Sequence, residues 1–181
     1  MTQWTLILLT TFLLLGQNSS GQTNQLTLPK QFNSLIFDKT NVAQGRNIIG
    51  KPSSERESWS NANLGFMCVR AYLTNLTFDN IGCELTFYSF KKDKNDKKVL
   101  SVMAFNSNST IKINDSLQLN YSDTSAVKKT FGTVGGSLAI DKEKNEINWN
   151  YKLILNSQNV SARFIFNSTG VLQKLEIMMG E

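Results

Sequence analysis

The chain has 181 residues, of which 40% are hydrophobic and 18% charged, and its formal net charge is +5. This much apolar material suffices for one folded domain and argues against a disordered chain. Histidine is absent, which excludes Ser-His-Asp and Cys-His catalysis and every metal site that needs an imidazole ligand. Two cysteines are too few for a four-thiolate zinc site. We therefore expect no metal and no cofactor.

Residues 1–21 are expected to be a signal peptide. The apolar run 6–15 has the length of a signal-peptide core and is too short to span a bilayer. Ser19 and Gly21 fit the two small-residue positions of a cleavage site, so the mature chain is expected to begin at Gln22. No Lys or Arg precedes the run, and an alternative is a buried helix or an uncleaved anchor. No later segment is long and apolar enough for a membrane span, so we expect a secreted, extracellular protein.

The expected secretory route makes the Asn-X-Ser/Thr pattern informative. After Gln22 the pattern occurs at Asn75, Asn108, Asn114, Asn120, Asn159 and Asn167. An N-linked glycan is bulky and solvated, so every used site has to lie on the surface. We expect most of these sites to be glycosylated, although an Asn-rich sequence also produces such patterns by chance.

Residues 22–64 show little periodicity and are expected to be a loop-rich N-terminal arm. Strand candidates in this region are limited to Leu35–Phe37. Short helices could lie in Asn41–Asn47 or in Ser53–Ser60, where polar residues prevail. We find no internal repeat and no linker in the sequence.

Alternation of apolar and polar residues dominates from residue 65 onward, which is typical of strands with one buried face. In 147–155 the odd positions are apolar, while the even ones are mostly Asn and Lys. Further candidates recur at a spacing of roughly 8–12 residues with turn-forming residues between them. They are 66–78, 84–90, 99–105, 110–113, 117–121, 129–133, 137–140, 159–167 and 171–178. The sequence predicts an all-β core over 65–181 within a single domain 22–181: an antiparallel sandwich or up-and-down barrel of about 8–10 short strands.

Cys68 and Cys83 are expected to form a disulfide, because an oxidising compartment offers each of them no other partner. The bridge conflicts with one strand assignment. If residues 79–82 form a hairpin turn, Phe78 lies opposite Cys83, and Cys68 lies about 34 Å further along the strand. The bridge therefore requires a turn nearer Asn75 or a bend in the strand, and otherwise the cysteines are unpaired.

A lysine cluster marks the predicted hairpin tip at residues 91–98. Its lysines are Lys91, Lys92, Lys94, Lys97 and Lys98. Such a cluster could bind an anionic surface such as an acidic glycan or protein. The alternative is a solvated loop that protects a sheet edge and keeps the protein soluble, and the interspersed Asp93 and Asp96 weaken the positive field. We expect no nucleic-acid partner, because no aromatic-and-basic recognition motif is present.

Trp59 and an alternating set of aromatic residues suggest a second class of function. Removing 21 of the 181 residues leaves about 160, and this length, the strand-rich meander and Trp59 resemble a lipocalin, although Glu57 stands where that family has glycine. The resemblance implies a barrel carrying a small apolar ligand. The residues that would line its cavity are Trp59, Trp149, Tyr151, Phe164 and Phe166. The alternative is that these aromatic residues simply fill a core.

Catalytic motifs are missing from the sequence. Glu84, Glu146 and Glu176 lie in or beside strand-like segments, but no pattern pairs them as a glycosidase acid and base would be paired. The function that we expect is non-enzymatic binding of an extracellular protein or anionic glycan. A lipocalin-like carrier is the first alternative, and a hydrolase that uses carboxylates alone is the second.

Overall fold

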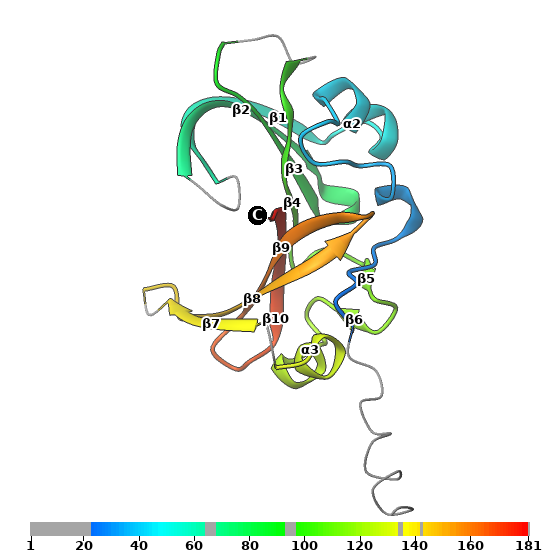
Figure 1. Ribbon diagram of the computed structural model, residues 1–181, viewed down its shortest axis with the longest axis vertical. Helices are drawn as coiled ribbons and strands as arrows, with labels where there is room; N and C mark the ends of the chain where they lie inside the picture. Colours follow the sequence, from blue (N-terminus) through cyan, green and yellow to red (C-terminus); the bar gives the residue numbers. More distant parts are fainter. Residues whose placement is uncertain (1–22, 64–67, 93–96, 134–135, 142, 181) are drawn as a thin grey trace, which may run out of the picture.

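A computed structural model describes residues 23–180 except 64–67, 93–96, 134–135 and 142 (Figure 1). The predicted signal peptide lies outside the described residues. The elements in chain order are η1 (Lys30–Phe32), α2 (Val42–Ile49), β1 (Ser54–Asn63), β2 (Cys68–Phe78), η2 (Asp79–Ile81), β3 (Cys83–Ser89), β4 (Val99–Phe105), β5 (Lys112–Ile113), β6 (Leu117–Gln118), α3 (Thr124–Phe131), β7 (Gly136–Asp141), β8 (Glu146–Leu155), β9 (Gln158–Phe166) and β10 (Leu172–Met179).

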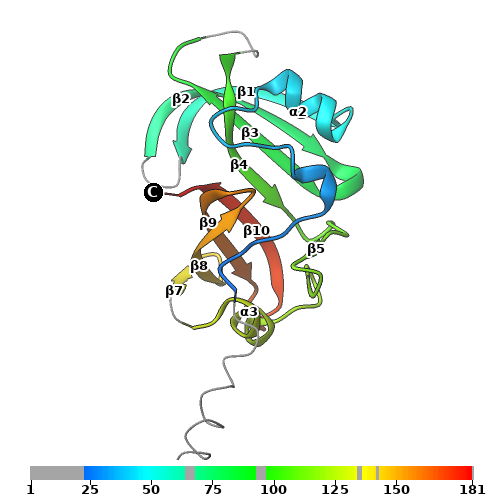
Figure 2. The same cartoon turned by 45° about the vertical axis from the view of Figure 1, so that its right-hand side comes forward.

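Eight strands form one antiparallel sheet in the order β1-β2-β3-β4-β10-β9-β8-β7, and β5 pairs with β6 in a second, two-stranded sheet. The predicted all-β antiparallel fold is confirmed. The large sheet is open, because β1 and β7 end it on opposite sides and do not neighbour each other in the strand order. It is strongly curved, and the helices and the N-terminal segment lie on one of its faces (Figure 2).

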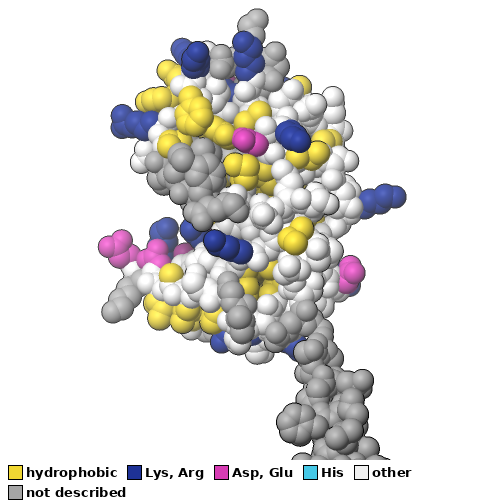
Figure 3. Space-filling view, viewed as in Figure 1, with side chains coloured by type: hydrophobic (Ala, Val, Ile, Leu, Met, Phe, Trp, Pro, Cys, Tyr) yellow, Lys and Arg dark blue, Asp and Glu magenta, His cyan; other side chains and the backbone are white. Residues whose placement is uncertain are grey.

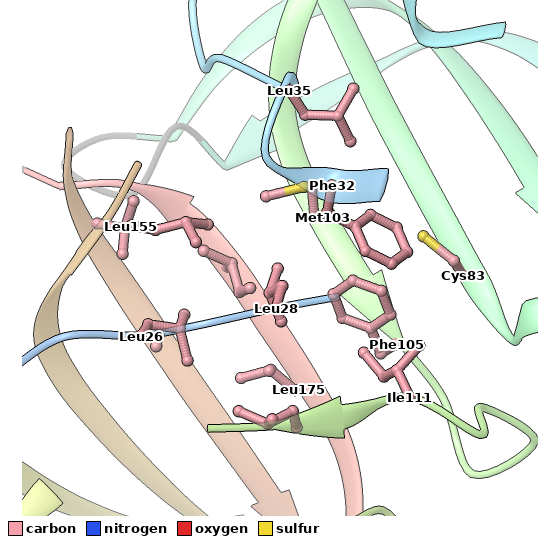
Figure 4. Close-up of a cluster of buried hydrophobic side chains, with 14 of the residues drawn as sticks. Leu26, Leu28, Phe32, Leu35, Cys83, Met103, Phe105, Ile111, Leu155 and Leu175 are labelled. Carbon is pink, nitrogen blue, oxygen red and sulfur yellow. The ribbon is translucent and has the colours of Figure 1, made fainter. Parts of the chain in front are cut away.

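The hydrophobic core lies between that face and the covering segments. The N-terminal segment crosses the sheet, and Leu26 and Leu28 point from it into the core (Figure 4). Gln25 forms a parallel bridge with Ile154, which attaches this segment to the part of β8 that β7 does not reach. The ring of Phe32 packs edge-on against that of Phe105, with 5.1 Å between the centroids. The predicted loop-rich arm therefore contributes directly to the core.

Two assignments in the arm are corrected by the structure. Residues 54–63 form strand β1, where a helix had been a candidate, and β1 pairs with β2 from Ser54↔Thr77 to Asn63↔Cys68. Both faces of β1 carry polar residues, so it has no apolar alternation to reveal it. Leu35–Phe37 forms no strand; it lies in a turn region in which Leu35 and Phe37 are buried. The Asn41–Asn47 helix candidate corresponds to α2.

A second helix, α3, occupies residues 124–131, where a strand over 129–133 had been predicted. Asp123 caps it by accepting the backbone N–H of Ala126 at 2.8 Å. Its buried residues, Val127 and Phe131, are four positions apart and lie on one helical face. Two turns give too short a periodicity to distinguish it from a strand.

The structure contains an internal repeat that the sequence did not reveal. Each half consists of a helix followed by a four-stranded meander: α2 with β1–β4, and α3 with β7–β10. The halves join where β4 pairs with β10, and Met103↔Ile177 and Phe105↔Leu175 lie at that joint. The strand order is therefore symmetric about the β4–β10 pair.

Hydrogen bonds around the two helices repeat with an offset of 82 residues. Thr40 Oγ1 accepts the N–H of Ile36 at 2.8 Å, and Ser122 Oγ accepts that of Gln118 at 2.8 Å. The N–H of Gly50 and that of Gly132 each close their helix at 2.7 Å. The register shifts match as well, because the extra residue is Ser101 in β4 and Gln173 in β10. These matches establish which positions of the two halves are structurally equivalent, although the residues at those positions mostly differ.

Candidate functional site

The predicted lysine cluster lies between β3 and β4 and is only partly a surface feature. Lys91, Lys92 and Lys97 are exposed, and Lys94 lies outside the described residues. Figure 3 shows Lys and Arg side chains at the end of the molecule where Figure 1 places the connection between β3 and β4. None of the ion pairs between described residues involves Lys91, Lys92 or Lys97. Among the described residues, no carboxylate lies within ion-pair distance of these three ammonium groups.

Lys98 differs from its neighbours, because only 3% of it is exposed. Its ammonium donates to Glu57 Oε1 on β1 and to Thr74 Oγ1 on β2, each at 2.7 Å. The expectation that Lys98 contacts an anionic partner is corrected accordingly: this lysine ties the start of β4 to the β1–β2 hairpin. Burying an ammonium requires such partners, since an unpaired one would be strongly destabilising.

Glu57 stands at the centre of this polar cluster with an exposed side chain. The hydrogen bond and the charge of Lys98 lower the pKa of the Glu57 carboxyl, and the charge of Lys92 lowers it further. Lys92 therefore lies near enough to Glu57 to affect its ionisation. The basic segment begins beside this hairpin, because Ser89 at the end of β3 pairs with Tyr72 of β2.

An aromatic pair adjoins this cluster on the same face of the hairpin. Trp59 lies two residues after Glu57 and pairs across the strands with Tyr72, with 4.3 Å between ring centroids. Trp59 is 48% exposed. Of the residues proposed to line a cavity, Trp59 thus lies on the surface. We call Trp59, Tyr72, Glu57, Lys91, Lys92 and Lys97 the basic–aromatic surface.

The other candidate cavity residues belong to the packed interior of the second half. Tyr151 and Phe164 meet edge-on at 5.8 Å between centroids, and Phe131 of α3 packs on Phe164 at 5.3 Å. Tyr151 donates its hydroxyl to the carbonyl of Gly132 at 2.9 Å. Phe166 is fully buried, whereas Trp149 is half-buried at the margin. Side chains from α3 thus fill the space next to Tyr151 and Phe164.

An open groove of about 410 Å³ lies elsewhere, over the β8–β9 hairpin. Its lining includes Asn24, Lys152, Asn159, Ser161 and Gly180, together with neighbouring apolar residues. None of the predicted cavity aromatics lines it. The structure therefore does not bring those aromatics together around this space.

The expected Cys68–Cys83 disulfide is absent, because Cys83 is free and fully buried. The β2–β3 hairpin turns at 79–82 and places Phe78 opposite Cys83, so Cys68 lies ten residues further along β2. Cys83 lies beside Phe32 and Met103 in the core (Figure 4). Burial raises the pKa of its thiol to about 12, which makes the thiolate rare and the thiol unreactive.

The glycosylation candidates differ in exposure. Asn108, Asn120 and Asn159 are exposed, whereas Asn75, Asn114 and Asn167 are half-buried. Asn114 holds the N-terminal segment by accepting the N–H of Thr27 at 2.8 Å and donating to the carbonyl of Gln25 at 2.7 Å. The Oδ1 atom of Asn75 is buried without a hydrogen-bond partner. Asn108 and Asn159 are thus exposed, and within the described residues their side chains hold no other segment as that of Asn114 does.

Of the carboxylates considered for a hydrolase, Glu84 and Glu176 lie on one face of the sheet on either side of Ala104, whereas Glu146 lies at the start of β8. Glu176 forms ion pairs with Arg163 at 3.4 Å and with Lys174 at 2.7 Å, while Glu84 lies on β3 and Glu146 begins β8. In the described part of the chain, no group of three His, Cys, Asp or Glu residues is placed to share a metal ion. The described helices include none with the length and apolar character needed to cross a membrane.

Comparison with known proteins identifies a related fold and no family. No protein-family model matches the chain, and no curated protein matches it. The crystal structure of a DUF4309 family protein (YjgB) from Bacillus subtilis is similar, with a TM-score of 0.52 and 13% sequence identity. The similarity covers 83% of this chain and 86% of that chain. At this identity it supports the fold alone.

Sequence reasoning missed Tyr72 and the structural role of Lys98. Tyr72 lies in a strand that was predicted, but its pairing with Trp59 depends on β1, which was not predicted. Nothing in the local sequence distinguishes Lys98 from Lys97, since both occur in one lysine run. The difference arises because β4 begins at Val99 and carries Lys98 against Glu57.

Proposed function

We propose that this protein is a secreted, N-glycosylated, non-enzymatic binding protein that recognises an anionic extracellular partner through the basic–aromatic surface. The partner is an acidic glycan or an acidic protein segment. The observation that carries this proposal is the position of the exposed Trp59 and the half-buried Tyr72 at the start of the basic segment, since Tyr72 pairs with Ser89, and the exposed lysines that follow have no described ion-pair partner.

The charge of this surface supports an anionic partner. Lys98 already pairs with Glu57, and the four lysines of residues 91–97 outnumber Asp93 and Asp96, so the segment keeps a net positive charge. Basic clusters raise the local concentration of anions and increase association rates, most strongly at low ionic strength.

The aromatic pair supplies contact area that the lysines lack. Trp and Tyr are rigid and amphipathic, and they are enriched among the residues that dominate binding energy in interfaces. Trp59 is held by Tyr72 across the hairpin, so little conformational entropy is lost when a partner covers it. Charge then attracts the partner, and the aromatic pair holds it.

The test uses protein produced from the full chain in eukaryotic cells. We expect it in the medium, with a mass that falls on N-glycosidase treatment, and retained on immobilised heparin as a probe of acidic glycans. Lys91→Ser, Lys92→Ser and Lys97→Ser combined are expected to weaken heparin binding about a hundredfold, since each lysine near an anionic surface contributes about 1 kcal/mol. Trp59→Ala is expected to weaken it about tenfold with little change in salt dependence.

Lys98 remains unchanged in these variants because it is structural. The matched control replaces three exposed lysines elsewhere, Lys39, Lys112 and Lys129, with serine and so removes the same charge. Equal weakening by the two triple variants would show that net charge alone causes retention. An acidic protein segment is the partner if the protein is not retained on immobilised heparin but is retained on an immobilised acidic peptide. If the protein is retained on neither probe, the proposal is contradicted.

A further inference from the structure

We propose that strand β7 is an interface at which a second copy of this chain docks by antiparallel β7–β7 pairing. The two copies would bury Leu138 and Ile140 against each other. These residues are 53% and 64% exposed, and they lie on the same face of β7 because they are two positions apart. The half-buried Ile147 and Trp149 lie opposite them on β8. Figure 3 shows a patch of hydrophobic side chains at the lower left, where Figure 1 places β7, with charged side chains beside it.

The internal repeat shows that this apolar strip is specific to the second half. The matched register shifts make Phe87 of β3 equivalent to Phe166 of β9. Following the strand pairing from these two residues to the outer edge of each half makes β1 equivalent to β7. Leu138 and Ile140 then occupy the positions of Glu55 and Glu57. In the first half these two carboxylates form ion pairs with Arg46 and Lys98.

The basic residues at equivalent positions of α2 and α3 also have different partners in the two halves. Lys128 of α3 is equivalent to Arg46 of α2, because each accepts, at its backbone carbonyl, the glycine N–H that closes its helix. Arg46 reaches the carboxylate of Glu55, whereas the Lys128 ammonium lies over the Trp149 ring, 4.6 Å from its centroid. The charged side of one half is thus replaced by an apolar and aromatic side in the other.

The edge of β7 is open to strand pairing. β7 is the last strand of the sheet, and its sequence from Gly136 to Ile140 contains no charge and no proline. Natural edge strands are usually protected from other chains by charges, proline or bulges. The opposite edge, β1, follows that rule with Glu55, Arg56 and Glu57. The edge of β7 lacks these protections over residues 136–140, which favours its pairing with another strand.

Self-complementarity points to a second copy as the occupant. A twofold axis through Ala139 places Leu138 of each copy opposite Ile140 of the other, and Ser137 opposite Asp141, so no like charges meet in the strand pair. The molecule already contains a joint of this kind, since its two halves are joined by antiparallel β4–β10 pairing. A glycan at Asn159 would project from the opposite face, because Asn159 alternates with the core residue Val160.

The test is sedimentation velocity of protein produced from the full chain, from about 1 µM to about 300 µM. We expect a monomer–dimer equilibrium with a dissociation constant of about 1–100 µM, because one strand pair is a small interface. Leu138→Lys combined with Ile140→Lys places lysines opposite each other and is expected to weaken the dimer at least about tenfold. The control Tyr121→Lys changes a residue that is 79% exposed elsewhere and should dimerise like the wild type.

A second measurement covers the case in which the double variant fails to fold. Backbone amides of β7 in the wild type should exchange hydrogen more slowly at high than at low protein concentration, whereas those of β1 should not change. A monomer at every concentration overturns the proposal, and in that case a strand from another protein becomes the candidate occupant. The proposal is also overturned if the double variant still dimerises and hydrogen exchange of β7 does not depend on protein concentration.

Discussion

At the scale of single residues, Lys98 shows how tertiary position changes the role of a side chain. Its chemistry is that of Lys97, one residue earlier, which is exposed. Lys98 is instead buried, and its ammonium bridges Glu57 and Thr74 on two different strands. A lysine in this position connects three strands and contributes to stability.

Replacing Lys98 with alanine is expected to lower the free energy of unfolding by about 1–3 kcal/mol, because its hydrogen bonds to Glu57 and Thr74 are lost and the buried alkyl chain is removed. Lys97→Ala is the matched control and should change it by less than about 0.5 kcal/mol. Urea denaturation followed by circular dichroism measures both. Equal changes in the free energy of unfolding for the two variants would show that Lys98 has no structural role.

The same ion pair has a pH dependence with a definite sign. The pKa of Glu57 is lowered from 4.5 in the folded protein, so its contribution to stability is present above about pH 4.5. That contribution is lost as the pH falls through the folded-state pKa. Glu57→Gln should therefore flatten the decline in stability below about pH 4.5, and an unchanged pH profile would contradict the assignment.

At the scale of elements, the β2–β3 connection determines both the strand register and the fate of the cysteines. η2 and the left-handed Gly82 turn the chain so that Phe78 meets Cys83. The turn packs against residues 106–109, since the carbonyl of Gly82 accepts the N–H of Asn106 at 3.0 Å. Ser109 donates its hydroxyl to the carbonyl of Ile81 at 2.7 Å. The turn is thus fixed by a tertiary contact as well as by its own sequence.

Gly82→Ala is expected to cost more than about 3 kcal/mol of stability, because strain at positive φ adds to a steric clash. A Cβ at Gly82 would lie 2.4 Å from the backbone nitrogen of Ser109. Gly170 is the matched control, since its φ is also positive but a Cβ there would meet nothing within 4 Å. Gly170→Ala should cost only about 1 kcal/mol in the same urea measurement. A similar loss at both positions would show that Ser109 can move away.

At the scale of the whole molecule, the repeat gives two halves that share one core. The N-terminal segment precedes the first half but also contacts the second, where Phe37 N–H donates to Gln158 Oε1 at 3.0 Å and Asn156 donates to the carbonyl of Phe32 at 3.4 Å. Core residues from both halves form one cluster. The β4–β10 joint is therefore internal to a single folding unit.

We expect the protein to unfold in one cooperative transition despite its repeat. Far-ultraviolet circular dichroism reports the sheet, and fluorescence reports Trp59 in the first half and Trp149 in the second. The urea midpoints from the two signals should coincide, since neither half can lose its partner without exposing the shared core. Two separated transitions would show that the halves are independent domains.

Local patterns in the sequence determined the fold class. Alternation of apolar residues predicted most strands of 65–181, because a strand with one buried face needs a period of two whatever its neighbours are. The same reasoning could not identify β1, since both of its faces are polar and only pairing with β2 makes it a strand. It also mistook α3 for a strand, because two helical turns are too short to establish a period.

The tertiary structure decided everything that depends on which strands meet. It separated Cys68 from Cys83, buried Lys98 beside Glu57, and paired Trp59 with Tyr72. It also revealed the repeat, which is preserved in hydrogen bonds and register shifts while the side chains differ. Residues far apart in sequence create these features, so local spacing could not choose between the alternatives: for the cysteines it left both a bridge and unpaired thiols open. The sequence by itself therefore determined an antiparallel β protein with a basic tip, and the pairing of its strands decided which lysine of that tip is buried and which strands form the edges of the sheet.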